Sequence, residues 1–214
     1  LIIFLVLLVS ESYAKSPPPG TGTSDVPANI LIMLDNSGSM RANLAVSTIT
    51  YYPTDVSTDS QGNIYVMELL HNRIKVFDST GKFLRSFGRY GWGCNQWRYA
   101  YSFEIYDDKI YVADYYGRRI KVLNLNGGCI TNFSTWANYP SGVALNNNRI
   151  VVRYRDWRNQ NYRKLSVYNR NTYAYIGTST MNSSQLTYGY TLNFNNAGDK
   201  LLAGHSQSNY NYLS

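Results

Sequence analysis

The sequence predicts an all-β fold assembled from repeated units, and three observations lead to this prediction. Residues 64–66 form a short run of β-branched and aromatic residues, and residues 73–76 alternate polar with apolar ones. A turn separates the two runs. Such runs are typical of half-buried strands. The pair returns at residues 110–112 and 119–122, both 46 positions further on. Two anchors at one offset indicate an internal repeat.

Weaker copies continue the repeat. Residues 149–152 and 164–167 repeat the two strands, and residues 199–203 resemble the start of a fourth copy. Repeats of about 40–50 residues with several short strands are typical of β-propeller blades. A single four-stranded blade cannot bury both of its faces, so blades must stack around an axis. We therefore expect a partial β-propeller of about three and a half blades over residues 51–214.

One repeat resembles a known family. Residues 55–88, DVSTDSQGNIYVMELLHNRIKVFDSTGKFLRSFG, resemble an NHL repeat, and the second copy resembles it as well. This resemblance covers residues 51–214 and implies a propeller of NHL-type four-stranded blades, a family that usually has six of them. Because the chain starts at Leu1 without a methionine and stops at Ser214 inside a strand pattern, we expect a fragment of a longer protein.

The N-terminal segment predicts export. Residues 1–9 are all apolar, too few to span a bilayer, which needs about 20. Ser12 and Ala14 are the small residues expected before a cleavage site, so residues 1–14 are interpreted as a signal peptide. A buried strand or helix is the alternative. Residues 15–27, rich in Ser, Pro, Gly and Thr, are expected to form a flexible linker. We expect a secreted or cell-surface protein that meets the membrane only transiently.

A second motif lies between the linker and the repeats. The apolar run at residues 30–34 predicts a strand buried on both faces. Asp35, Ser37 and Ser39 follow it on a tight turn and supply hard oxygen ligands, which suit Mg²⁺ or another divalent cation. The alternative interpretation is a plain Ser/Gly turn after a core strand.

Residues 28–50 resemble the start of a von Willebrand factor A domain, an α/β fold, where D-x-S-x-S opens the metal-ion-dependent adhesion site. By this resemblance Asp35, Ser37 and Ser39 are ligands, and a partner's acidic group completes the shell. Residues 40–50 leave room for one short helix only, so the site is incomplete in this fragment. Either the domain resumes after the propeller or the motif is a relic. The run LDNSGSM is typical of PilY-type adhesins at the tip of type IV pili.

Composition and charge favour an acidic ligand. Lys and Arg number 20 against 13 Asp and Glu, a net charge of +7, and the chain has 21 Tyr. Export argues against nucleic acid, so we expect an anionic polysaccharide, a lipopolysaccharide, a host glycan or an acidic protein. The alternative is that the charge only keeps the surface soluble. The candidate ligand-binding residues form one cluster: Arg153, Tyr154, Arg155, Trp157 and Arg158. A solvated loop explains this cluster equally well.

The two cysteines are predicted to form a disulfide. In the alignment of repeats Cys129 falls on the last strand of the second blade, and Cys94 falls in an insertion at residues 90–98 after the first blade. Neighbouring blades and an exported chain make this bond feasible. The recurrent Arg73 and Arg119 are interpreted as structural, each paired with an acidic group near the turn.

The sequence does not predict an enzyme. His71 and His205 are too few for a zinc site, and no nucleophile motif or phosphate-binding loop is present. We expect an exported adhesion protein that binds an extracellular protein or glycan, with pilus subunits as further partners. The alternative is a propeller hydrolase or lyase whose catalytic residues lie beyond the fragment. A ring of carboxylates at the axis would favour that alternative.

Overall fold

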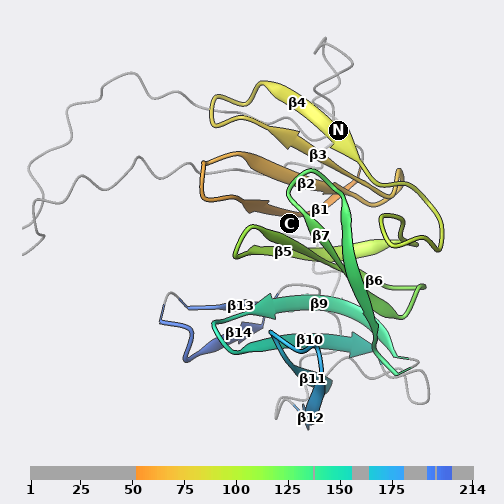
Figure 1. The fold of residues 1–214 in the computed structure, drawn as a ribbon, viewed down its shortest axis with the longest axis vertical. Helices are drawn as coiled ribbons and strands as arrows, with labels where there is room; N and C mark the ends of the chain where they lie inside the picture. The colour runs from red at the N-terminus through yellow and green to blue at the C-terminus, as the bar shows by residue number, and fades with distance from the viewer. Residues whose placement is uncertain (1–51, 137, 156–163, 181–191, 196, 204–214) are drawn as a thin grey trace, which may run out of the picture.

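The computed structural model describes residues 52–136, 138–155, 164–180, 192–195 and 197–203, and every regular element within them is a β-strand (Figure 1). The first sheet contains β1 (Pro53–Thr58), β2 (Ile64–Glu68), β3 (Arg73–Phe77) and β4 (Phe83–Phe87). The second contains β5 (Ala100–Tyr106), β6 (Lys109–Asp114), β7 (Arg119–Asn124) and β8 (Cys129–Ser134). The third contains β9 (Tyr139–Leu145), β10 (Arg149–Arg155), β11 (Lys164–Asn169) and β12 (Tyr175–Thr180). Strands β13 (Leu192–Phe194) and β14 (Leu201–Ala203) form an antiparallel pair. The all-β prediction is confirmed for these residues.

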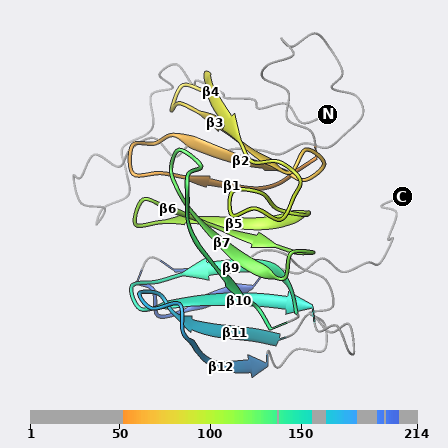
Figure 2. The ribbon, with the colours of Figure 1, turned by 45° about the vertical axis from the view of Figure 1, so that its right-hand side comes forward.

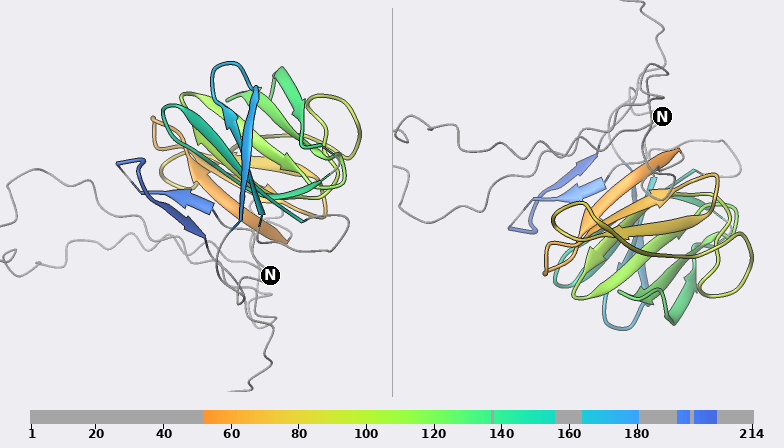
Figure 3. Two further views of the ribbon diagram at one scale, coloured as in Figure 1. Left: turned by 90° about the horizontal axis from the view of Figure 1, so that it is seen from below. Right: turned by 90° about the horizontal axis from the view of Figure 1, so that it is seen from above.

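The sheets are stacked as propeller blades are. Each is an antiparallel meander in which the strand order follows the sequence. The first strands β1, β5, β9 and β13 contact one another in succession, as the inner strands of propeller blades do. Figure 2 shows β1, β5 and β9 following one another down the stack. Figure 3 looks along the stack and shows strands of successive sheets crossing at an angle. The predicted blade architecture is therefore confirmed.

The inner strands are the part of each blade that the repeat pattern did not identify. The two strands read from the sequence correspond to β2 and β3 in the first blade and to β6 and β7 in the second. Strand β1 has the mixed sequence PTDVST. Its polar side chains accept hydrogen bonds from the inner strand of the next blade, β5: Asp55 Oδ2 accepts one from the Phe103 amide at 2.9 Å. In the next blade Ser102 Oγ accepts one from the Val143 amide at 3.4 Å. The free edges of inner strands are thus satisfied across the blades.

The hydrophobic core lies between the sheets. One buried cluster joins the first and second blades, and it includes Tyr65, Met67, Ile74, Trp97 and Phe103. A second joins the second and third blades, and it includes Tyr111, Ile120, Val143, Ile150 and Tyr168. Each such side chain contributes about 1.5–3 kcal/mol when it is fully buried. Both faces of the middle blade are therefore covered by neighbours.

Buried charges recur in the first two blades. Glu68 is fully buried between Arg73, which donates through Nε, and Lys75, whose Nζ lies 3.3 Å from Oε1. In the second blade Asp114 takes the place of Glu68 and lies 3.7 Å from Lys121 Nζ. Arg73 pairs with the predicted acidic group, a buried carboxylate that would otherwise be costly. Arg119 differs from the prediction: it donates to the Gly117 carbonyl at 3.2 Å and to Asn132 Oδ1 at 3.0 Å instead of pairing with Asp114.

Several predictions concern residues outside the described ones. They are the signal peptide 1–14, the linker 15–27 and the A-domain-like segment 28–50, which includes the candidate metal ligands Asp35, Ser37 and Ser39. Within the described part of the chain, no helix has the length and apolarity to cross a membrane.

Candidate functional site

A cleft opens at the end of the sheets where β4 leads into β5 and where β6 turns into β7. Its volume is about 370 Å³, and its lining residues are Trp92, Arg98, Tyr116, Gly117, Arg118 and Tyr139. We call it the aromatic–arginine cleft. Its size lies within the range of small-ligand pockets. Trp92 is 63% exposed and Tyr116 is 45% exposed, so large flat rings are available to a ligand.

Both arginines of the cleft lie over aromatic rings. The guanidinium carbon of Arg98 is 4.2 Å from the centroid of the Trp92 ring, and its Nε donates to the Tyr90 hydroxyl at 3.2 Å. The guanidinium carbon of Arg118 is 4.7 Å from the centroid of the Tyr139 ring, and Nη2 donates to the Tyr139 hydroxyl at 2.8 Å. Among the described residues no carboxylate pairs with either side chain. The stacking restrains two positive charges that keep most of their hydrogen-bond donors.

A cluster of tyrosines, which we call the tyrosine floor, packs against the cleft's lining residues Tyr116 and Tyr139. Tyr115 is buried and stacks on Tyr139 with ring centroids 5.1 Å apart. Tyr101 and Tyr116 meet Tyr115 edge to face at 5.2 and 5.0 Å. Such aromatic pairs contribute about 0.5–1.5 kcal/mol each beyond their buried area. The floor is therefore rigid, and Tyr116 and Tyr139 stay in place without a ligand.

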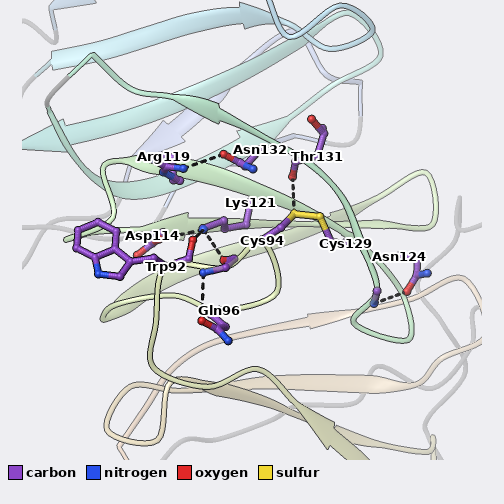
Figure 4. The surroundings of a disulfide bond; sticks show 12 residues. Trp92, Cys94, Gln96, Asp114, Arg119, Lys121, Asn124, Cys129, Thr131 and Asn132 are labelled. Carbon is purple, nitrogen blue, oxygen red and sulfur yellow. Dashed lines mark hydrogen bonds and ion pairs between the residues drawn. A yellow bond between two sulfur atoms is a disulfide. The ribbon is translucent and has the colours of Figure 1, made fainter.

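Two tethers hold the wall that carries Trp92 (Figure 4). A disulfide joins Cys94 to Cys129 on β8, with Cα atoms 5.5 Å apart, so the structure joins the cysteine pair expected from the sequence. The buried Lys121 Nζ donates to the carbonyl oxygens of Trp92 at 3.2 Å and Gly93 at 2.7 Å. The loop has no regular strand of its own, so these bonds to the second blade fix its path.

The same loop is anchored to the core by Trp97. This side chain is fully buried between the first two blades. It passes directly over Gly88, which has φ +93° and where a Cβ would lie 2.1 Å from the indole ring. Only glycine combines this backbone conformation with so close a contact.

Asp114 connects the two walls of the cleft. Its Oδ1 accepts hydrogen bonds from the amide of Arg98 at 2.7 Å and from the amide of Gly117 at 3.1 Å. A Cβ at position 117 would lie 1.8 Å from Oδ2, so the turn requires glycine there. Burial raises the pKa of Asp114 above its usual value, against the opposing effect of these amides and of Lys121. Asp114 therefore positions both arginines without touching the open side of the cleft.

The described members of the predicted ligand-binding cluster lie on strand β10. Arg153 is fully buried and Tyr154 is nearly so, both within strand β10. Arg155 is half-buried, and its Nη1 donates to the Tyr115 hydroxyl at 3.3 Å, beside the tyrosine floor. Trp157 and Arg158 lie outside the described residues. None of the described members of this cluster lines the aromatic–arginine cleft.

Sequence reasoning missed most of the residues that line the cleft. Trp92 and Arg98 were visible only as part of an insertion, and Tyr116, Arg118 and Tyr139 were not singled out. The insertion at residues 90–98 was the available signal, because it is dense in aromatic residues and sits between two repeats.

A different pocket lies at the opposite end of the sheets, near the inner strands. Its volume is about 390 Å³, and its lining includes Glu104, Tyr106, Asn146, Asn193 and Gly198. Burial raises the pKa of Glu104 to about 8, and the negative charge of Asp55 adds to the shift. Burial also raises the pKa of Asp55 to about 6. The described residues contain no group of three or more His, Cys, Asp or Glu side chains placed to hold a metal ion.

Comparison with solved structures shows a shared fold. Hydrazine Synthase from Kuenenia stuttgartiensis superposes with a TM-score of 0.56 at 9% identity, covering 76% of this chain and 45% of that chain. The WD40 repeats of RRP9 align with a TM-score of 0.49 at 12% identity, over 60% of this chain and 38% of that one. U3-55K gives 0.49 at 14% identity, over 60% and 39%. The chain thus spans less than half the length of each structure.

Sequence comparison identifies the family. No curated protein sequence matches the chain. A family model described as a 6-bladed beta-propeller matches residues 53–203, which include every strand of the structure. The stacked four-stranded sheets and this match agree, and the chain belongs to that family of 6-bladed beta-propellers.

Proposed function

We propose that this chain is the recognition part of an exported cell-surface adhesion protein, which binds a protein or glycan through the aromatic–arginine cleft. One observation carries the proposal: Arg98 and Arg118 are stacked on aromatic rings and pair with no carboxylate of the described residues. Exposed rings and restrained guanidinium groups are what binding surfaces concentrate. The residues that line the cleft offer contacts rather than a nucleophile or a base, so binding without catalysis is the primary role.

Two features support export. The apolar residues 1–9 followed by Ser12 and Ala14 match a signal peptide. The Cys94–Cys129 disulfide fits an oxidising compartment, where such bonds persist.

A test of recognition compares two exposed tryptophans. The chain from residue 15 onward is applied to an array of bacterial and mammalian glycans and to fibronectin, collagen and mucin. We expect binding that Trp92→Ala weakens about tenfold, the effect of losing a central contact. Trp136→Ala is the matched control, because Trp136 is 70% exposed and does not line the cleft. Equal binding by both variants, or no binding to the array and the three proteins, would contradict the proposal.

The finer assignment rests on resemblance. The blades are NHL-type, residues 28–50 begin a von Willebrand A-like domain, and Asp35, Ser37 and Ser39 hold a divalent cation such as Mg²⁺. The whole protein is then a type IV pilus tip component with pilus subunits as partners. Calorimetric titration of the full-length protein with Mg²⁺ tests the metal site. We expect heat of binding that Asp35→Ala abolishes, and absence of binding in the wild type would refute the site.

The alternative, a propeller hydrolase or lyase, is favoured by a separate observation. Asp55 and Glu104 are carboxyls of neighbouring inner strands, and both have a raised pKa. A carboxyl with a pKa near neutrality is suited to general acid catalysis. Hydrolysis of aryl esters or lactones that Glu104→Gln abolishes, with folding unchanged, would establish this alternative.

A further inference from the structure

We propose that the ligand of the aromatic–arginine cleft is an acidic polysaccharide. Its carboxylate or sulfate groups bind Arg98 and Arg118, and its sugar rings stack on Trp92 and Tyr116. This inference deepens the proposed recognition function and rests on it.

The charge of the cleft has no internal counterpart among the described residues. Arg98 and Arg118 line it from two different loops, and neither has a carboxylate partner there. Asp114 lies beneath them, but its oxygens face two backbone amides and Lys121. An anionic ligand would therefore be the counterion of the two guanidinium groups.

A second arginine stack in the same molecule shows what the cleft lacks. The guanidinium carbon of Arg170 is 4.9 Å from the centroid of the Tyr106 ring, much as Arg118 lies on Tyr139. Arg170 is neutralised, because its Nη1 lies 3.0 Å from Asp107 Oδ2. The distances from guanidinium to ring are similar at both places, but among the described residues a carboxylate pairs with Arg170 and none pairs with Arg118. We assign the role of counterion at the cleft to the ligand.

The donors of the two arginines suit a planar or tetrahedral anion. A guanidinium has five N–H donors. Arg98 uses Nε for Tyr90, and Arg118 uses Nη2 for Tyr139. The remaining donors have no partner among the described residues, and a guanidinium binds carboxylate or sulfate oxygens through two parallel bonds.

The exposed rings favour an acidic sugar over other anionic ligands. Trp92 and Tyr116 present large rings to solvent at the same cleft. The negative face of an aromatic ring attracts the positively polarised C–H groups of a sugar face. A simple polyanion such as an acidic peptide would use the arginines and leave the exposed surfaces of these rings in water.

The disulfide favours a polysaccharide over RNA. Bases also stack on aromatic rings beside arginines, so the cleft alone does not separate the two. The loop that carries Trp92 and Arg98 is closed by Cys94–Cys129, and disulfides persist outside the reducing cytosol. Acidic polysaccharides are the common polyanions there.

The experiment uses the chain from residue 15 onward and calorimetry with five probes: polygalacturonate, heparin, neutral dextran, poly(U) and poly-L-glutamate. Hydrogen bonds to charged groups are the strong ones in a binding site, so Arg98→Gln and Arg118→Gln should each weaken binding about tenfold or more. Arg170→Gln is the matched control and should change it less than about twofold. Arg118→Lys keeps the charge but loses the two-bond geometry, and we expect an intermediate loss. Melting temperatures of all variants verify their folding.

The outcomes distinguish failure of the polysaccharide inference from failure of the proposed recognition function. Binding to polygalacturonate supports a ligand with carboxylate groups, and binding to heparin alone supports a sulfated ligand. Either conclusion requires that Arg98→Gln and Arg118→Gln lose this binding. Stronger binding to poly(U) or poly-L-glutamate overturns the inference and leaves recognition by the cleft intact. Equal losses for Arg170→Gln and the cleft variants show unspecific charge attraction and also overturn it. If no acidic polymer binds while Trp92-dependent binding to a neutral glycan or a protein remains, only the polysaccharide inference fails.

Discussion

The two ends of the sheets use the same arginine–tyrosine stack for different purposes. At one end Arg170 lies on Tyr106 and is paired with Asp107. At the other end Arg118 lies on Tyr139, and no carboxylate of the described residues pairs with it. Stacking alone restrains a guanidinium. Whether its positive charge is neutralised within the protein depends on a nearby carboxylate. The difference indicates which end has charge available for a partner.

The carboxyl groups show the same division. At the cleft end Asp114 is tied to two amides and to Lys121, and it serves the architecture of both walls. At the other end Glu104 forms no hydrogen bond with the described residues, and its main electrostatic neighbour there is another carboxyl, Asp55. The cleft end therefore has positive charge that no carboxylate of the described residues neutralises. The opposite end has an acidic group that burial makes costly to ionise.

The largest expected effect concerns the anchor of the cleft wall. Gly88→Ala places a methyl group against the buried Trp97 ring in a backbone conformation that alanine disfavours. We expect a loss of about 3–5 kcal/mol, in the range of severe core disruption. Gly177→Ala is the matched control, because nothing lies within 4 Å of a Cβ there. Chemical denaturation of both variants measures the difference. Similar stabilities would show that Trp97 does not anchor this wall.

The next effect concerns the disulfide. Cys94 and Cys129 are separated by 35 positions, and closing a loop of that length stabilises the folded state by about 3–4 kcal/mol in the chain-entropy model. Cys94→Ser with Cys129→Ser should lose a stability of this order. We also expect Trp92 in this variant to become more accessible to acrylamide, which fluorescence quenching measures against the background of the other tryptophans. A variant with unchanged quenching would contradict the role of the disulfide in fixing this loop.

The prediction from sequence succeeded where the signal is local. Strands β2, β3, β6 and β7 carry the apolar alternation of the repeat, so their number and spacing could be read directly. The inner strand β1 could not be, because its sequence mixes polar and apolar residues and includes Asp55, which accepts a hydrogen bond from the next blade. The aromatic–arginine cleft could not be predicted either. It is assembled from Trp92, Tyr116 and Tyr139 on separate loops, and their proximity exists only after the blades stack.

At the opposite end we expect an effect on stability that depends on pH. The pKa of Glu104 is about 8 in the folded protein against 4.5 for the free side chain. Between these values the folded state binds more protons than the unfolded one, so stability falls as pH rises. The penalty is absent below pH 4.5 and complete above about pH 8. Glu104→Gln should therefore melt higher than wild type at pH 8.5 and equally at pH 4.5. Asp108→Asn, an exposed change in the β5–β6 turn, is the control. Parallel melting curves at both pH values would refute the burial of an unpaired carboxyl.

The most direct test of the account is hydrogen–deuterium exchange with and without saturating polygalacturonate. The account predicts slower exchange in the segments that form the aromatic–arginine cleft, residues 90–99 and 115–118. It predicts unchanged exchange at residues 146–148 and 197–200, beside the pocket at the opposite end. Protection confined to the opposite end, or no protection at either, would contradict the claim that the cleft is the end that meets the ligand.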